Sequence, residues 1–207
     1  MTRRLAAIGI MALVLCTATP ASAATPTETL KAYSDVVLKI LEDPALRGPE
    51  RKQERRVAVR KVAEEVFDLG ETAKRALGPH WQQRTPAERE EFVHLFADLL
   101  ESTYIAKIDL YGGERLKFTD EKVDGDIAVV RAKDTTKQGT DVPVEARMNK
   151  KNDRWLIYDV AIENISLISN YRAQFDRIIR TNSYGELVKR LRNRGEFLQE
   201  KDRRAGG

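Results

Sequence analysis

The spacing of apolar residues changes twice along this 207-residue chain. Up to about residue 108, apolar side chains recur at the three- and four-residue intervals of amphipathic helices. Between residues 116 and 162 they alternate with polar ones, as in strands with one buried face. Helical spacing returns from Ile165. Helices on both sides of a run of consecutive strands predict a single α+β domain.

Several helix starts are marked by capping sequences. Thr25 and Thr85 each precede a proline and stand three residues before a glutamate, which predicts capping boxes, and Ser183 begins a weaker example. Gly78 and Pro79 are expected to end a helix, because glycine accepts a left-handed C-cap and proline cannot continue the helix. The predicted helices cover residues 26–42, 49–67, 69–77, 86–108, 165–181 and 184–193.

The alternating stretch predicts four strands, close to residues 116–119, 126–133, 142–148 and 155–162. Asp124-Gly125 suits a hairpin turn with positive φ, and a second turn is expected near residues 151–153. Pro143 places its strand at an edge of the sheet or beside a bulge. Short connections between consecutive strands favour a four-stranded antiparallel meander, packed against the helices.

The first 23 residues have the order of a secretory signal peptide. Two arginines precede the apolar run Leu5–Cys16, and the segment ends in Ala21-Ser22-Ala23. The run is shorter than the roughly 20 residues that span a bilayer. We therefore expect cleavage after Ala23 and a periplasmic location, with one domain over residues 24–195 and a charged, disordered tail over 196–207.

The sequence contains little that predicts catalysis. Cleavage removes Cys16, the single cysteine, and with it any thiol nucleophile or thiolate ligand. His80 and His94 have no companion at a metal-binding spacing, so no metal is expected. Asp159 and Glu163 are the candidates for an acid–base pair, or else for a salt bridge or a contact at a helix end. We expect no catalytic residue and no cofactor.

Charged residues of both signs are mixed along the chain. The net charge of +4 falls by two when Arg3 and Arg4 leave with the signal peptide. No basic stripe carries interleaved aromatic residues, which argues against a nucleic-acid partner. The basic face of the second predicted helix is either a docking surface or a solvated face. It consists of Arg51, Lys52, Arg55, Arg56, Arg60 and Lys61.

Two stretches resemble the MlaC/toluene-tolerance family. Residues 155–175, WLIYDVAIENISLISNYRAQF, are similar to the family signature with its Trp, Tyr-Asp, Glu-Gly, Ser and Tyr-Arg-x-Gln-Phe positions. Residues 77–81, LGPHW, together with Thr85 and residues 92–104, resemble the family's L-G-x-x-W segment and phenylalanine-rich helix. The likeness extends over nearly the whole mature chain.

Three positions depart from the family pattern, one of them being Glu88 or Arg89 in place of a glutamine before the first phenylalanine of the fourth predicted helix. Asn164 replaces a glycine, and asparagine also tolerates the left-handed region, so we expect the turn to survive. Ala146 replaces the usual aromatic residue of the third strand, which predicts an enlarged or reshaped cavity.

The resemblance implies a monomeric periplasmic carrier with phospholipid as its cargo. Similar proteins shuttle lipid between an outer-membrane lipoprotein and porin complex and an inner-membrane ABC permease with its substrate-binding subunit, which maintains outer-membrane lipid asymmetry. Acyl chains lie in an apolar cavity between sheet and helices. The residues expected to contact lipid are Trp81, Phe92, Phe96, Leu99, Leu100, Tyr104, Val129, Val144, Val160, Ile162, Tyr171, Arg172 and Phe175.

Other interpretations remain open from the sequence. The apolar stripes either close into a solid core or leave a slot for hydrocarbon, and composition does not separate the two. Arg172 is expected either near the cavity mouth, pairing with a phosphate, or in a pair with Glu163 or Asp159. The alternatives are a carrier of hopanoid or another polycyclic lipid, a periplasmic adaptor without ligand, and an enzyme that uses Asp159 and Glu163.

Overall fold

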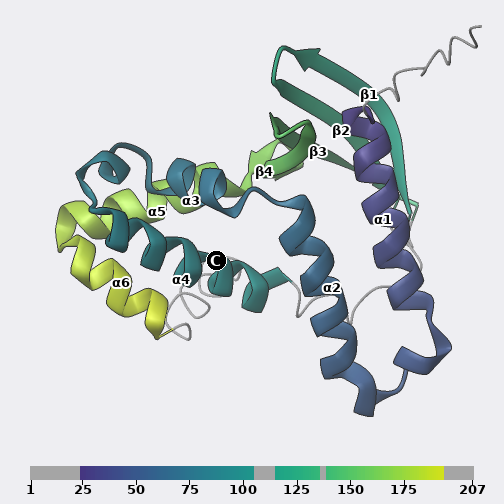
Figure 1. The fold of residues 1–207 in the computed structure, drawn as a ribbon, viewed down its shortest axis with the longest axis horizontal. Coiled ribbons are helices and arrows are strands. Elements are labelled where there is room, and N and C mark those ends of the chain that lie inside the picture. Colours follow the sequence, from purple (N-terminus) through teal and green to yellow (C-terminus); the bar gives the residue numbers. More distant parts are fainter. Residues whose placement is uncertain (1–23, 105–114, 136–138, 194–207) are drawn as a thin grey trace, which may run out of the picture.

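The computed structural model describes residues 24–104, 115–135 and 139–193. These residues form one five-stranded antiparallel sheet in the order β1-β2-β3-β4-β5 (Figure 1). The predicted α+β meander is confirmed, and a short fifth strand extends it. The strands are β1 (Leu116–Asp124), β2 (Ile127–Thr135), β3 (Asp141–Lys151), β4 (Arg154–Ile162) and β5 (Ile165–Ser166).

The helices form two groups (Figure 1). A hairpin of α1 and α2 lies against one face of the sheet, and α3, α4, α5 and α6 pack on one another beside it. Within the described residues, no helix is long and apolar enough to cross a membrane. The bounds are α1 (Pro26–Glu42), α2 (Lys52–Val66), α3 (Leu69–Leu77), α4 (Pro86–Tyr104), α5 (Leu167–Thr181) and α6 (Tyr184–Arg192), with 3₁₀ turns η1 (Pro44–Leu46), η2 (Pro49–Arg51) and η3 (Gly78–Gln83).

Some predictions fall outside the described residues. These are the signal peptide over 1–23, the tail over 196–207, and the last residues, 105–108, of the fourth predicted helix.

Two of the three predicted capping boxes are complete. The Thr25 amide donates to Glu28 Oε2 at 2.8 Å, and the Glu28 amide donates to Thr25 Oγ1 at 3.1 Å. Thr85 makes the same pair of bonds with Glu88, at 2.8 and 3.2 Å. At α6, Ser183 Oγ accepts from the backbone, but the Glu186 carboxylate accepts instead from Arg190 Nε at 2.9 Å. That box is half formed, because the arginine one turn later supplies a charged donor.

The start of the fifth helix, α5, differs from its prediction. Ile165 and Ser166 pair with β4 as strand β5, and α5 begins at Leu167 with Ser166 as its N-cap. The turn before β5 places Glu163 at φ 51° and Asn164 at φ 65°. Asparagine therefore adopts the left-handed conformation expected of it.

β4 contains a bulge at Tyr158. Arg147 pairs with Asp159 and Met148 pairs with Ile157, so Tyr158 has no partner on β3. An extra residue reverses the alternation of the strand. The regular alternation predicted for this strand is therefore wrong, and Ile157 and Val160 both face the helices α1 and α2.

Pro143 does not mark an edge. It lies near the start of β3, a central strand, opposite Lys133 and before pairing with β4 begins at Val144. Its carbonyl accepts from the Glu163 amide at 2.9 Å. Proline has no backbone N–H to donate, but it is tolerated here because Pro143 uses only its carbonyl oxygen toward the chain beyond β4.

Two separate cores stabilise the fold. The helical core lies among α3, α4, α5 and α6 and centres on Phe96, whose ring centroid is 5.1 Å from that of Tyr171 and 5.3 Å from that of Phe175. The sheet core joins Ala128, Val130, Met148, Trp155 and Ile157 to α1 and α2. Edge-to-face contacts add to the large apolar area that each aromatic ring buries.

Candidate functional site

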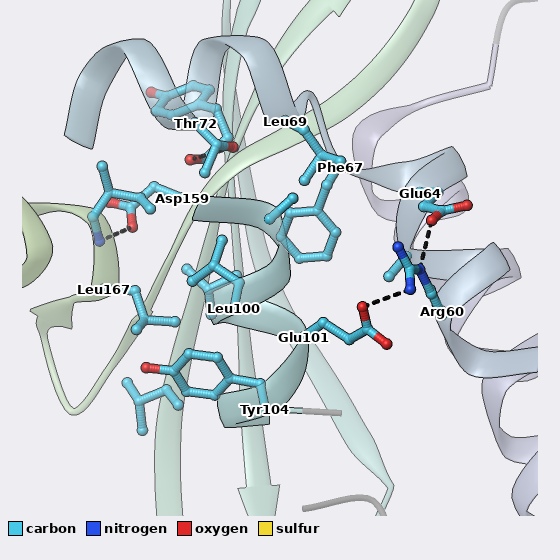
Figure 2. A pocket seen from close by; sticks show the side chains of 16 residues that line it. Arg60, Glu64, Phe67, Leu69, Thr72, Leu100, Glu101, Tyr104, Asp159 and Leu167 are labelled. Carbon is cyan, nitrogen blue, oxygen red and sulfur yellow. Dashed lines mark hydrogen bonds and ion pairs between the residues drawn. The ribbon is translucent and has the colours of Figure 1, made fainter. Parts of the chain in front are cut away.

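Two apolar cavities lie beside the two cores. The interhelical cavity, of about 310 Å³, lies between α2, α3, α4, β4 and the start of α5 and is partly open to solvent (Figure 2). This volume falls in the range of about 300–1,000 Å³ that is typical of small-molecule sites. The interhelical cavity is lined by Arg60, Ala63, Glu64, Phe67, Leu69, Thr72, Ala97, Leu100, Glu101, Tyr104, Tyr158, Asp159, Val160, Ile162, Leu167 and Ile168.

The second, or sheet cavity, has a volume of about 340 Å³ and lies between the α1–α2 hairpin and the sheet. Ala63, Phe67 and Val160 line both cavities and form the partition between them. The sheet cavity is lined by Leu30, Tyr33, Ser34, Val37, Val59, Val62, Ala63, Val66, Phe67, Leu116, Phe118, Val130, Ala132, Val144, Ala146, Ile157 and Val160.

Helix α4 separates core from cavity with two adjacent stripes. Phe92, Phe96 and Leu99 are at most 1% exposed and belong to the helical core. Leu100 and Tyr104 lie on the neighbouring stripe and face the interhelical cavity. The wide apolar face read from the sequence thus serves two purposes, and only the second stripe meets empty space.

The structure brings part of the predicted site together. Leu100, Tyr104 and Ile162 line the interhelical cavity, Val144 lines the sheet cavity, and Val160 lines both. Ala146, singled out as a departure from the family pattern, also lines the sheet cavity.

The other predicted contact residues lie elsewhere. Five of them form solid core: Phe92, Phe96, Leu99, Tyr171 and Phe175. Trp81 packs against the outside of that core, with the Arg89 guanidinium 5.3 Å from its ring centroid. Val129 lies opposite Arg147 on β3, on the face of β2 away from buried Val130. None of these residues lines either cavity: the five core residues pack against protein, Trp81 packs on the outside of the core, and Val129 lies on the other face of its strand.

Arg172 also lies outside both cavities. Its Nη2 donates to Ser169 Oγ at 3.4 Å, and its Cδ packs against Gly78, 3.0 Å from where a Cβ would stand. Gly78 has φ +57°, so a side chain there is disfavoured by conformation as well as by this contact. Arg172 thus supports the turn after α3.

Asp159 is engaged in structure. Its Oδ2 accepts from Ser166 Oγ at 2.6 Å and from Arg147 Nη1 at 3.1 Å, while Oδ1 accepts from the Ile168 amide at 3.1 Å. A carboxylate at this position stabilises the N-terminus of α5. The partner of Asp159 is therefore Arg147 rather than Arg172, and Glu163 stands in the exposed turn beyond β4.

Sequence reasoning missed several lining residues, among them Ala63, Leu69, Thr72, Tyr158 and Leu167. Small or isolated residues such as Ala63 and Thr72 give no hydrophobic signal, and Tyr158 reaches the cavity because of the β4 bulge. Among the described residues, no group of three acidic, histidine or cysteine side chains could hold a metal ion.

The charged side chains of the interhelical cavity lie in two separate places. Figure 2 shows Arg60, Glu64 and Glu101 together at the edge between α2 and α4, away from Asp159 and Leu167. Burial raises the pKa of the Tyr104 phenol, and the neighbouring Tyr171 adds to this shift. Tyr104 therefore stays neutral at ordinary pH and contributes mainly its ring to the lining.

Comparisons with known proteins match the chain over most of its length. The family model described as MlaC protein matches residues 31–193. A solved structure described as the phospholipid-binding protein from Ralstonia solanacearum in complex with a phospholipid has a TM-score of 0.72 and 28% sequence identity. The match covers 83% of this chain and 97% of that one.

Proposed function

Because this chain belongs to the MlaC family, we propose that it is a periplasmic carrier that binds phospholipid through its acyl chains. The interhelical cavity is the observation that carries the proposal. Most of its lining side chains are apolar, and three of its four charged members, Arg60, Glu64 and Glu101, lie together at one edge. Such a surface suits a molecule with hydrocarbon tails and a polar end.

The energetics favour a carrier. Each methylene removed from water contributes about 0.8 kcal/mol, so a chain with about 14 of them costs on the order of 11 kcal/mol to expose. A protein that shelters the chains lowers this cost during passage through water. In this proposal one tail occupies the interhelical cavity and the other the sheet cavity, on either side of Phe67.

The wider setting is part of the same proposal. The chain is exported, loses residues 1–23, and moves lipid between an outer-membrane lipoprotein and porin complex and an inner-membrane ABC permease with its substrate-binding subunit. This exchange maintains the lipid asymmetry of the outer membrane. The domain over residues 24–195 acts as a monomer and needs no cofactor.

Extraction of lipid from the native protein tests the proposal. Protein purified from the periplasm is extracted with organic solvent, and the extract is analysed by mass spectrometry. We expect about one phospholipid for each protein molecule. A hopanoid or other polycyclic lipid in its place would support the carrier of another lipid, and an extract without amphiphile would support the adaptor and overturn the carrier.

A matched pair of variants locates the cargo. Leu100→Asp places a carboxylate in the interhelical cavity, whereas His94→Asp places one on the exposed side of the same helix. We expect Leu100→Asp to lose bound phospholipid while remaining folded, and His94→Asp to keep it. Normal lipid content in folded Leu100→Asp would remove this cavity from the site.

A further inference from the structure

An ion-pair cluster of three residues stands at the edge of the interhelical cavity. Arg60 Nε lies 2.8 Å from Glu64 Oε1 on the same helix, and Arg60 Nη1 lies 2.8 Å from Glu101 Oε2 on α4 (Figure 2). The cluster therefore bridges α2 and α4 at the place where the apolar lining ends.

The side chains of the cluster reach both solvent and cavity. Their exposed fractions are 44% for Arg60, 51% for Glu64 and 31% for Glu101, and all three line the cavity. The fourth charged residue of the lining, Asp159, is only 4% exposed and already bonded to Ser166 and Arg147. The cluster is thus the part of the lining where a charged group can remain hydrated.

The charges of the cluster are unequal. One guanidinium meets two carboxylates, so the three side chains together carry a net charge of −1. Arg60 has five N–H donors, and its two ion pairs engage Nε and Nη1. A bound phosphodiester can accept from the remaining donors, but the two carboxylates repel any further negative charge beside it.

We propose that Arg60, Glu64 and Glu101 form a headgroup site that selects a zwitterionic phospholipid with an ammonium group over an anionic one. The inference rests on the proposed lipid-carrier function and names its preferred substrate class. The phosphate accepts from Arg60, and the ammonium donates to Glu101 or Glu64. A zwitterionic headgroup adds no net charge, so the total stays at −1, whereas a glycerol headgroup leaves its phosphate unbalanced and brings the total to −2.

A competition experiment tests this selection. The protein is freed of lipid and loaded from vesicles that contain equal amounts of phosphatidylethanolamine and phosphatidylglycerol with the same acyl chains. Bound lipid is then quantified by mass spectrometry, both as a total and as a ratio. For the wild type we expect phosphatidylethanolamine to be enriched about two- to fivefold over the vesicles, as suits part-exposed ion pairs.

Charge reversal supplies the decisive variant. We expect Glu101→Lys to reverse the ratio in favour of phosphatidylglycerol, because the cluster then carries a net charge of +1. The control is Glu54→Lys on α2, because Glu54 forms an exposed ion pair with Arg51 at 2.7 Å but does not line the cavity. Glu54→Lys should keep the wild-type ratio.

The outcomes separate the two proposals. Wild-type protein that binds lipid in the vesicle ratio, or Glu101→Lys that binds lipid in the wild-type ratio, would overturn the headgroup site and leave the carrier standing. Wild-type protein that binds neither lipid would overturn the carrier function itself.

Discussion

Two buried carboxylates, Asp68 and Asp159, show how single residues hold the elements around the cavities. Each accepts a backbone N–H near the start of a helix: Asp68 from Glu71 at 3.0 Å in α3, and Asp159 from Ile168 at 3.1 Å in α5. Each also has a basic partner on β3. The sheet and the helical group are thereby joined through charge-assisted hydrogen bonds.

Asp68 makes the stability of the fold depend on pH. Burial alone would raise the pKa of this carboxyl, but hydrogen bonds from Glu71, Asn149 and Lys151 hold the pKa below its ordinary value. The unfolded pKa is about 3.9. The stabilisation is therefore present above about pH 4 and is lost as the pH falls through the folded pKa.

The expected result is a pH-dependent effect of Asp68→Asn. Its cost in free energy of unfolding, measured by urea titration, should be greatest near neutral pH and should shrink as the pH falls below about 4. A cost that stays the same from pH 7 to pH 3 would contradict the role assigned to the charge.

Asp159→Asn tests the second carboxylate. The amide leaves Arg147 without its charge partner and cannot accept equally from Ser166 and the Ile168 amide. We expect a loss of about 1–3 kcal/mol in the free energy of unfolding. The control, Asp120→Asn, removes an exposed ion pair with Arg131 at 2.6 Å and should cost less than about 1 kcal/mol. Equal costs would contradict the structural role of Asp159.

At the scale of elements, α4 determines both core and cavity. Its Phe92–Phe96–Leu99 stripe is sealed in the helical core, and its Leu100–Tyr104 stripe faces empty space. Phe96→Ala should therefore cost about 3–5 kcal/mol of stability. Leu100→Ala should cost distinctly less, because its side chain already borders a cavity. Urea titration of both variants measures the difference, and similar costs would place Leu100 in solid core.

The sheet cavity gives a second element-scale prediction, at Ala146 on β3. Ala146→Phe should fill part of the 340 Å³ space, lower the amount of bound phospholipid and leave the thermal midpoint nearly unchanged. The control, Ala73→Phe, inserts the same ring into a packed position that is 0% exposed. Overpacking there should cost about 1–3 kcal/mol. Full lipid content in folded Ala146→Phe would remove the sheet cavity from the site.

The sequence predicted the elements better than the site. Caps at Thr25 and Thr85 and the alternation of β2 and β3 depend on near neighbours, so local patterns reveal them. The bulge at Tyr158 and strand β5 arise from pairing with distant residues, which no local pattern records. Phe96 and Leu100 are both apolar residues of α4, so the sequence does not tell core from cavity. The position of the neighbouring helices decides which of the two side chains is packed and which borders a cavity.

For the whole molecule, the two cores pack separately and leave cavities on either side of the Ala63–Phe67–Val160 partition. A protein of this size usually closes its interior to the density of an organic crystal. An apolar space that remains open represents lost packing energy, which a bound hydrocarbon restores. The unfilled cavities are therefore consistent with a cargo that completes the core.

A crystal structure of the protein loaded with a phospholipid whose acyl chains carry bromine tests directly whether the acyl chains occupy the two cavities. The account predicts anomalous bromine peaks in both cavities, beside Leu100 in the interhelical cavity and beside Ala146 in the sheet cavity. Bromine found only outside the two cavities, or an interior filled by the protein's own side chains, would contradict it.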